Sequence, residues 1–220
     1  MPFVLFANVN FVPGRYDDWQ AAYDKLGAYV WEKEPTTLTY YFGVPLQYWT
    51  HKSDTTHMFA FEVYGERHDL YTTHFSSPAM QDFLAAIPET MTTGLDLKHY
   101  EDVGGFLDRF GDKRECELMT DVRITCHENS RDKVLSKLVT LVNAMKDSGS
   151  AEVYTLLVLK SLDDNTGVRF YQRFKSWQAS TTFARNELVL DFWMTSKEDI
   201  ASMESQSYIP NGKGWLHRED

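Results

Sequence analysis

The hydrophobic residues of the first half of the chain recur with the periods of strands and helices. Phe3–Phe11 alternates at every second residue and carries apolar residues on both faces, which predicts a strand that is covered on both sides. Trp19, Tyr23, Leu26 and Val30 then recur at three- and four-residue spacing, which predicts an amphipathic helix. Further along, strands are predicted at 37–44, 58–64 and 94–103, and helices at 66–74 and 77–87. The order β-α-β-β-α-β is that of a ferredoxin-like unit of about 110 residues.

The second half of the chain repeats this order. Alternation predicts a strand at Glu117–Thr125, and an apolar stripe after Ser130 predicts a helix. Strands are predicted at 153–159 and 168–174, around a turn-rich segment, and a helix at 177–185. Gly105-Phe106-Leu107-Asp108-Arg109 recurs as Gly214-Trp215-Leu216-His217-Arg218, at an offset of 214 − 105 = 109 residues. We therefore expect two tandem domains, 1–110 and 116–220, with a charged linker at 111–115.

Each unit of this type covers one face of its sheet with helices, so the other face needs a partner. The repeat supplies that partner within the same chain. The expected fold class is α+β, with two tandem ferredoxin-like units packed sheet to sheet. Such packing leaves an interior cavity for a small apolar ligand, unless side chains fill the interior.

Composition and charge exclude several classes of protein. The 220 residues are 43% hydrophobic, which is enough for a substantial core. The net charge of −10 repels a polyanion, so nucleic acid is not an expected partner. No run of about 18 apolar residues and no positively charged leader is present, so we expect a cytoplasmic protein without membrane contact. Cys116 and Cys126 flank a predicted strand that holds them beyond disulfide reach, and we expect two free thiols.

The segment Phe59–Leu84 carries the most informative motif. It contains Phe61-Glu62-Val63-Tyr64-Gly65-Glu66-Arg67, followed by Leu70, Tyr71, His74, Ser77-Pro78 and Phe83. This order of residues resembles the antibiotic biosynthesis monooxygenase family, and the match covers roughly residues 3–109. In the second half only Tyr171–Phe174 and the terminal Gly-Trp-Leu resemble it. There Gln172 stands at the place of Glu62, and no histidine stands at the place of His74.

The resemblance implies a dimeric α/β-barrel, here formed within one chain, in a tandem form associated with fungal members. It also implies a role in secondary metabolism, in which a polyketide quinol or anthrone, or a jasmonate-like oxylipin, is oxygenated without metal or flavin. No cofactor is therefore expected, and O2 is the co-substrate. The related haem-degrading barrels use an asparagine on the first strand, where Asn8 stands, but the rest of their haem-binding pattern is missing, so haem is not expected.

Oxygenation without a cofactor requires the substrate to supply the electrons, which an enolate or phenolate does better than its neutral form. The site therefore needs a base and a hydrogen-bond donor in a place that excludes water. His74 is the preferred base because histidine titrates near working pH. Asn8, a polar residue on an apolar strand face, is a candidate to orient the substrate oxygen. Glu62 and Tyr64 share one sheet face, where Glu62 can orient a histidine or tyrosine and Tyr64 can donate to substrate. For each of the four, a purely structural role is the alternative.

Substrate-binding residues are expected on one helix face and among the aromatic residues. Arg67, Tyr71 and His74 share a helical face by their spacing, so Arg67 can bind a substrate carboxylate, unless it is a solvated surface residue. The aromatic residues that suit either a flat apolar cavity or the core are Phe6, Tyr40, Phe42, Trp49 and Tyr100.

Other chemistries find no support in the sequence. The histidine pairs 51/57 and 68/74 have no nearby cysteine or carboxylate cluster, so no metal site is predicted. Neither a phosphate-binding glycine loop nor a nucleophile elbow occurs. We expect a cofactor-independent monooxygenase for a small, hydrophobic, enolisable or phenolic metabolite. A polyketide cyclase or isomerase and a non-catalytic small-molecule-binding barrel are the alternatives, and a homodimer of the tandem chain stays open.

Overall fold

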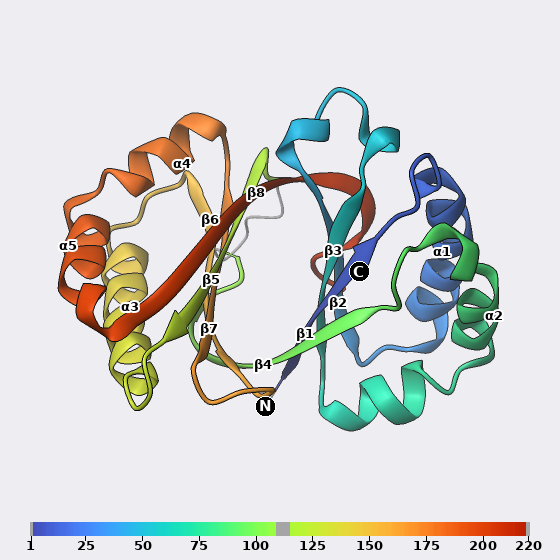
Figure 1. The fold of residues 1–220 in the computed structure, drawn as a ribbon, viewed down its shortest axis with the longest axis horizontal. Helices are drawn as coiled ribbons and strands as arrows, with labels where there is room; N and C mark the ends of the chain where they lie inside the picture. Colours follow the sequence, from blue (N-terminus) through green and yellow to red (C-terminus); the bar gives the residue numbers. More distant parts are fainter. Residues whose placement is uncertain (1, 109–114, 219–220) are drawn as a thin grey trace. The chain divides into compact units, whose positions relative to one another are not determined.

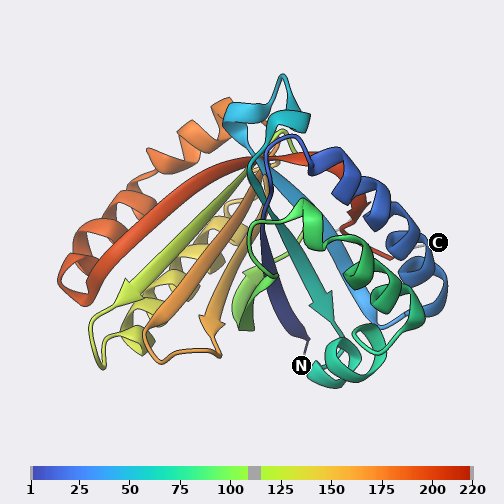
Figure 2. The ribbon, with the colours of Figure 1, turned by 45° about the vertical axis from the view of Figure 1, so that its right-hand side comes forward.

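The computed structural model describes residues 2–108 and 115–218, which form two compact units. Within these residues, unit 1 consists of 2–99 and 211–218, and unit 2 of 100–210. Each unit combines an antiparallel sheet with helices that cover one of its faces (Figures 1 and 2). The chain thus contains two units of the predicted α+β type.

Unit 1 is built around the central strand of its sheet. Its elements, including the strand that leaves it, are β1 (Phe3–Asn10), α1 (Tyr16–Lys33), β2 (Thr37–Pro45), η1 (Leu46–Tyr48), η2 (Lys52–Asp54), β3 (His57–Tyr64), η3 (Asp69–His74), α2 (Pro78–Ala86), η4 (Pro88–Thr90) and β4 (Asp96–Phe106). Strand β3 lies between β1 and β2 and pairs antiparallel with both. The predicted strands and helices are confirmed, except that η3 is a π-helix.

Helix α1 packs on this sheet through its predicted apolar stripe. Trp19, Tyr23, Leu26 and Val30 are each at most 3% exposed. The Trp19 and Tyr23 rings stack at 5.9 Å, and Tyr23 meets Phe42 of β2 edge-on at 4.5 Å. Full burial of such a side chain contributes about 1.5–3 kcal/mol, so this aromatic stack holds the helix on the sheet.

Unit 2 repeats the arrangement and ends with two elements that the sequence pattern did not delimit. Its elements are β5 (Leu118–Cys126), α3 (Arg131–Asp147), β6 (Val153–Ser161), β7 (Gly167–Phe174), α4 (Trp177–Ala184), α5 (Glu187–Ser196), η5 (Lys197–Asp199) and β8 (Ile200–Trp215). Strand β7 lies between β5 and β6. Helix α5 carries apolar residues on exposed positions as well, and β8 is polar and largely exposed. Neither segment therefore shows a clean period.

Strands β4 and β8 each contribute residues to both units. Residues 96–99 of β4 belong to unit 1, whereas Tyr100–Phe106 pair with β6 in unit 2. Residues 200–208 of β8 pair with β5, and residues 211–215 belong to unit 1. The hydrogen-bonded order is β1-β3-β2-β8-β5-β7-β6-β4, which closes on itself. This order is that of an intrachain dimeric α/β-barrel of two tandem ferredoxin-like units, as expected.

The compact units differ from the sequence halves 1–110 and 116–220 because of this exchange of strand ends. The predicted linker at 111–115 falls almost entirely on residues outside the described ranges. Cys116 and Cys126 are buried thiols and, as expected, form no disulfide with each other in the structure. Across the described ranges, no helix is both long and apolar enough to cross a membrane.

The repeated glycine motif lies at the end of each exchanged strand. Gly105 adopts a φ of +116°, and a Cβ at this position would lie 1.9 Å from the carbonyl oxygen of Leu156 in β6. Gly214 adopts a φ of +75°, and a Cβ there would lie 1.8 Å from the carbonyl oxygen of Tyr40 in β2. Both positions therefore require glycine for two reasons: the backbone has a positive φ, and the neighbouring strand leaves no room for a Cβ.

A threonine next to each glycine contact fixes the same strand end. The hydroxyl of Thr39 donates to the carbonyl of Leu216 at 2.8 Å, and the hydroxyl of Thr155 donates to the carbonyl of Leu107. The duplicated motif thus has the same bonding in both units, which explains why it survives where most of the repeat has diverged.

We expect Gly105→Ala and Gly214→Ala each to lower the free energy of unfolding by more than about 3 kcal/mol, because strain and a backbone clash add. Gly149→Ala is the control, since Gly149 also has a positive φ of +72° but no atom within 4 Å of its Cβ position. It should cost only about 1 kcal/mol. Denaturant unfolding of the three variants measures the difference. Equal losses for all three would show that the strand contact is not tight.

Candidate active site

His74 ends a π-helical turn and lies against Glu34. In η3 the backbone N–H of Phe75 donates to the carbonyl of Leu70 at 2.9 Å, the wide spacing of a π-helix. Glu34 is the residue at the C-terminal end of α1. Nδ1 of His74 lies 2.7 Å from Oε2 of Glu34, and both side chains are only 2% exposed. Because π-helical turns are rare and occur frequently at functional sites, this pair is the first candidate for chemistry.

Glu62 and Tyr64 lie beside this pair on β3. The Tyr64 hydroxyl donates to Oε2 of Glu62 at 2.6 Å, which confirms that the two share a sheet face. The ring centroids of Tyr64 and Tyr40 lie 5.9 Å and 5.8 Å from that of His74. The imidazole is therefore enclosed by a carboxylate that it contacts, a second carboxyl group and two phenols.

Burial raises the pKa values of Glu62, Tyr40 and Tyr64. It raises the pKa of the Glu62 carboxyl, against the opposing effects of a positive charge on His74 and of the Tyr64 hydrogen bond, while the negative charge of Glu34 adds to it. Burial, with the Glu62 charge, also holds the pKa values of Tyr40 and Tyr64 well above 10, so both phenols stay protonated as donors. Oε1 of Glu34 has no hydrogen-bond partner among the described residues.

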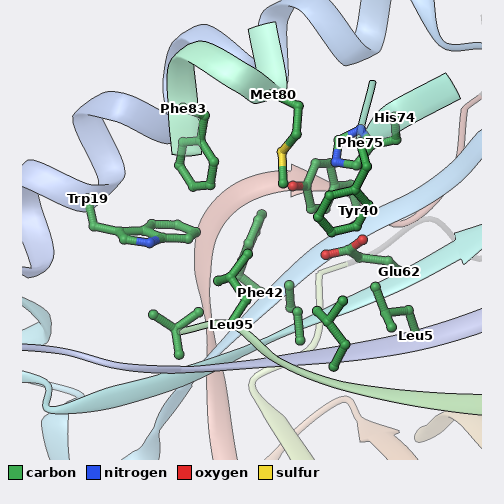
Figure 3. Close-up of a pocket in the computed structure, with 14 residues that line it drawn as sticks. Leu5, Trp19, Tyr40, Phe42, Glu62, His74, Phe75, Met80, Phe83 and Leu95 are labelled. Atoms are coloured by element: carbon green, nitrogen blue, oxygen red, sulfur yellow. The ribbon is translucent and has the colours of Figure 1, made fainter. Parts of the chain in front are cut away.

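An apolar cavity lies between the sheet and the helices of unit 1, and Tyr40, Glu62 and His74 are among the residues that line it (Figure 3). Figure 3 shows Trp19 and Phe83 at one end of the cavity and His74 and Glu62 at the other. Its open volume is about 20 Å³, room for a single water-sized molecule. The residues that line it are Leu5, Ala7, Val9, Trp19, Tyr40, Phe42, Ala60, Glu62, His74, Phe75, Met80, Phe83, Leu95 and Leu97.

Four of the predicted site residues line this cavity, namely His74, Glu62, Tyr40 and Phe42, and a fifth, Tyr64, reaches it through Glu62. The cavity lies on the helix-covered face of the sheet, whereas the sequence predicted one on the opposite face.

Asn8 and Phe6 lie on that opposite face, because they alternate with the cavity residues Leu5 and Ala7. The Asn8 amide nitrogen donates to the side chain of Asp96 at 3.2 Å. Phe6 packs against aromatic rings of β3. The structure therefore does not bring Asn8 or Phe6 together with His74, and it gives Asn8 a structural contact.

The remaining predicted residues lie elsewhere. The Arg67 guanidinium stacks on the ring of Tyr71 at 5.0 Å, and the Tyr71 hydroxyl lies 2.6 Å from Nε2 of His99. Trp49 is 68% exposed. Tyr100 belongs to unit 2. None of these four predicted residues is among those that line the cavity of unit 1.

The residue that sequence reasoning missed is Glu34. It directly follows α1 and precedes Pro35, and nothing in the local pattern showed that its carboxylate turns inward. Within the described residues, no group of three histidine, cysteine or acidic side chains has the spacing of a metal site.

We expect Glu62→Gln to gain stability relative to wild type as pH rises. Because burial raises the pKa of Glu62, the folded state holds this proton more tightly than the unfolded state, where the pKa is about 4.3. The contribution of Glu62 to wild-type stability therefore falls as pH rises from the unfolded pKa through the folded one, and glutamine avoids this loss. Melting temperatures between about pH 4 and 7 measure the effect. Glu89→Gln, at an exposed position, is the control. A difference between Glu62→Gln and wild type that does not change with pH would contradict the assignment.

Neither a family model nor a curated protein sequence matches the chain. Solved structures do. A protein named "putative monooxygenase" from Fusobacterium nucleatum aligns over 100% of this chain and 98% of its own, with a TM-score of 0.81 and 12% identity. A second protein of that name, from Lactobacillus acidophilus, aligns over 95% and 93%, with a TM-score of 0.73 and 9% identity.

A third structure is named "anthrone oxidase-like protein". It aligns over 95% of this chain and 90% of its own, with a TM-score of 0.62 and 14% identity. Identities this low establish the fold and not the activity. The chain therefore has, over its full length, the tandem dimeric α/β-barrel fold of these proteins, in agreement with its resemblance to the antibiotic biosynthesis monooxygenase family.

Proposed function

We propose that unit 1 is a cofactor-independent monooxygenase site that deprotonates a small, hydrophobic, enolisable or phenolic metabolite and lets O2 oxidise the anion. The observation that carries the proposal is the buried His74–Glu34 pair at the edge of an apolar cavity. The names of the structural neighbours agree with this class of reaction, and an anthrone is the substrate type that one of those names suggests.

His74 is the proposed general base. A carboxylate only accepts, so the contact with Glu34 places the proton of the neutral imidazole on Nδ1 and leaves the lone pair on Nε2. When Nε2 takes the substrate proton, Glu34 stabilises the resulting imidazolium. Glu34 is thus a positioning residue, in the manner of the carboxylate in other acid–histidine pairs.

Tyr40 is the proposed donor to the substrate oxygen. It lines the cavity, and its raised pKa keeps it protonated. A donor at the enolate oxygen stabilises the charge that develops as His74 removes the proton. The apolar walls exclude bulk water, which strengthens both interactions.

In the overall reaction of a methylene substrate, one methylene group and one molecule of O2 give one carbonyl group and one molecule of water. Both C–H bonds of the methylene carbon break, and that carbon supplies all four electrons that O2 accepts. One oxygen atom enters the carbonyl group, and the other leaves as water with the two protons, so no external reductant is needed. The cavity is closed around a water-sized space, so binding of a ring system requires η3 and α2 to move outward, as active-site segments commonly do.

We expect His74→Ala to lower the rate of oxygen uptake with an anthrone by about 10²–10⁴-fold, the usual contribution of a general base. Glu34→Gln should lower kcat less, because the imidazolium loses only its neighbouring charge. His68→Ala, an exposed histidine on the same segment, is the matched control and should keep the wild-type rate. An oxygen electrode measures the uptake rates of metal-free wild type and of the three variants, and the rate of autoxidation without protein is subtracted.

Uptake by wild type no faster than autoxidation would contradict the proposal for anthrones. Uptake that is equal in wild type and His74→Ala would contradict the role of the histidine. Conversion of the substrate without oxygen consumption would replace the monooxygenase with an isomerase or cyclase that uses the same base.

A further inference from the structure

Unit 2 contains a much larger cavity than unit 1, at the corresponding place between its sheet and its helices. The open volume is about 400 Å³, within the range of small-molecule sites. It is lined from β5, β7, α4, α5 and β8 by Leu118, Thr120, Val122, Phe170, Gln172, Trp177, Ser180, Thr181, Phe183, Ala184, Arg185, Val189, Trp193, Met203, Ser205 and Ser207.

Shorter side chains open this cavity. The residues at the wall are Leu97 of β4 and the preceding Leu95 in unit 1, but Ser205 and Ser207 of β8 in unit 2. Ala184 stands at the offset of 110 residues from His74, the offset that relates Tyr64 to Phe174. The space that leucine and histidine side chains fill in unit 1 is therefore open in unit 2.

Gln172 gives the cavity a polar group without a partner. It occupies the register position of Glu62, since Thr120 is opposite Gln172 as Leu5 is opposite Glu62. Gln172 is only 5% exposed and lines the cavity, and its amide forms no hydrogen bond with any described residue. Because an amide both donates and accepts hydrogen bonds, Gln172 can bind a hydroxyl or carbonyl group of a ligand in the cavity.

The mouth of the cavity is apolar with one positive charge. Trp177 and Met203 are 55% and 49% exposed there. Arg185 also lines the cavity and is exposed. An amphipathic ligand would cover the two apolar side chains and place an acidic group near Arg185.

We infer that the cavity of unit 2 is a second, non-catalytic binding site for a small amphipathic acid, with a hydroxyl or carbonyl group on an apolar ring system or chain. The hydroxyl or carbonyl binds Gln172, the apolar body fills the space above Ser205 and Ser207, and the acidic group faces Arg185. No base stands at this site, because Gln172 and Ala184 replace Glu62 and His74. Ligand binding here is therefore independent of the chemistry proposed for unit 1.

Titration of the full chain with 1-hydroxy-2-naphthoate, followed by calorimetry, tests this inference. We expect saturable binding that Ser205→Leu weakens at least tenfold by filling the cavity, and that Gln172→Leu weakens about fivefold or more by removing the amide at similar volume. Ser202→Leu is the matched control, because Ser202 is exposed on the same strand and does not line the cavity. His74→Ala should bind like wild type, which separates this site from that of unit 1.

Melting temperatures of all variants establish that each is folded at the temperature of the titration. Binding that is lost in Ser205→Leu and weakened in Gln172→Leu, but kept in Ser202→Leu and His74→Ala, supports the inference. No saturable binding by wild type, or the same affinity in wild type, Ser205→Leu and Gln172→Leu, overturns it. Loss of binding in His74→Ala alone would assign the ligand to unit 1 and also overturns it.

Discussion

The polar groups buried in unit 1 must be compensated inside the protein, because water hardly reaches them. Glu34 is paired with His74, and Glu62 with Tyr64. Breaking a buried pair by removing one partner typically costs about 3–5 kcal/mol, so the imidazole has to reach the end of α1. The π-helical turn of η3 ends at the residue that makes this contact. The same contact that pairs Oε2 of a buried carboxylate also fixes the tautomer of the proposed base.

The two units share one fold and differ in what fills the space between sheet and helices. Unit 1 keeps two carboxyl groups and a histidine around a water-sized cavity. In unit 2 a neutral amide and an alanine stand at two of these positions, and serines replace leucines at the wall, which leaves about 400 Å³ open. After the duplication, unit 1 thus has the buried ionisable groups and unit 2 has the larger cavity. The strand ends that join the units kept their glycines because no other residue fits there.

Much of the fold follows from the sequence, since the strands and helices of unit 1 have clean periods and parity alone puts Glu62 and Tyr64 on one face. The alternation of side chains along a strand also places Asn8 and Leu5 on opposite faces of the sheet. It does not show which face the helices cover, and the prediction therefore grouped Asn8 with His74. The inward turn of Glu34 depends on a contact 40 residues away. The repeated glycine motif indicated a duplication but not the exchange of strand ends, because the pairing partners of those ends are set by long-range contacts that no local pattern encodes.

Proton abstraction by His74 can be measured apart from oxidation. With O2 excluded, wild type should accelerate exchange of the methylene protons of an anthrone for deuterium from heavy water, as followed by NMR. His74→Ala should reduce the exchange to the rate without protein, and Glu34→Gln should slow it, while His68→Ala should leave it unchanged. Exchange at the same rate with wild type, with His74→Ala and without protein would show that His74 does not remove a substrate proton.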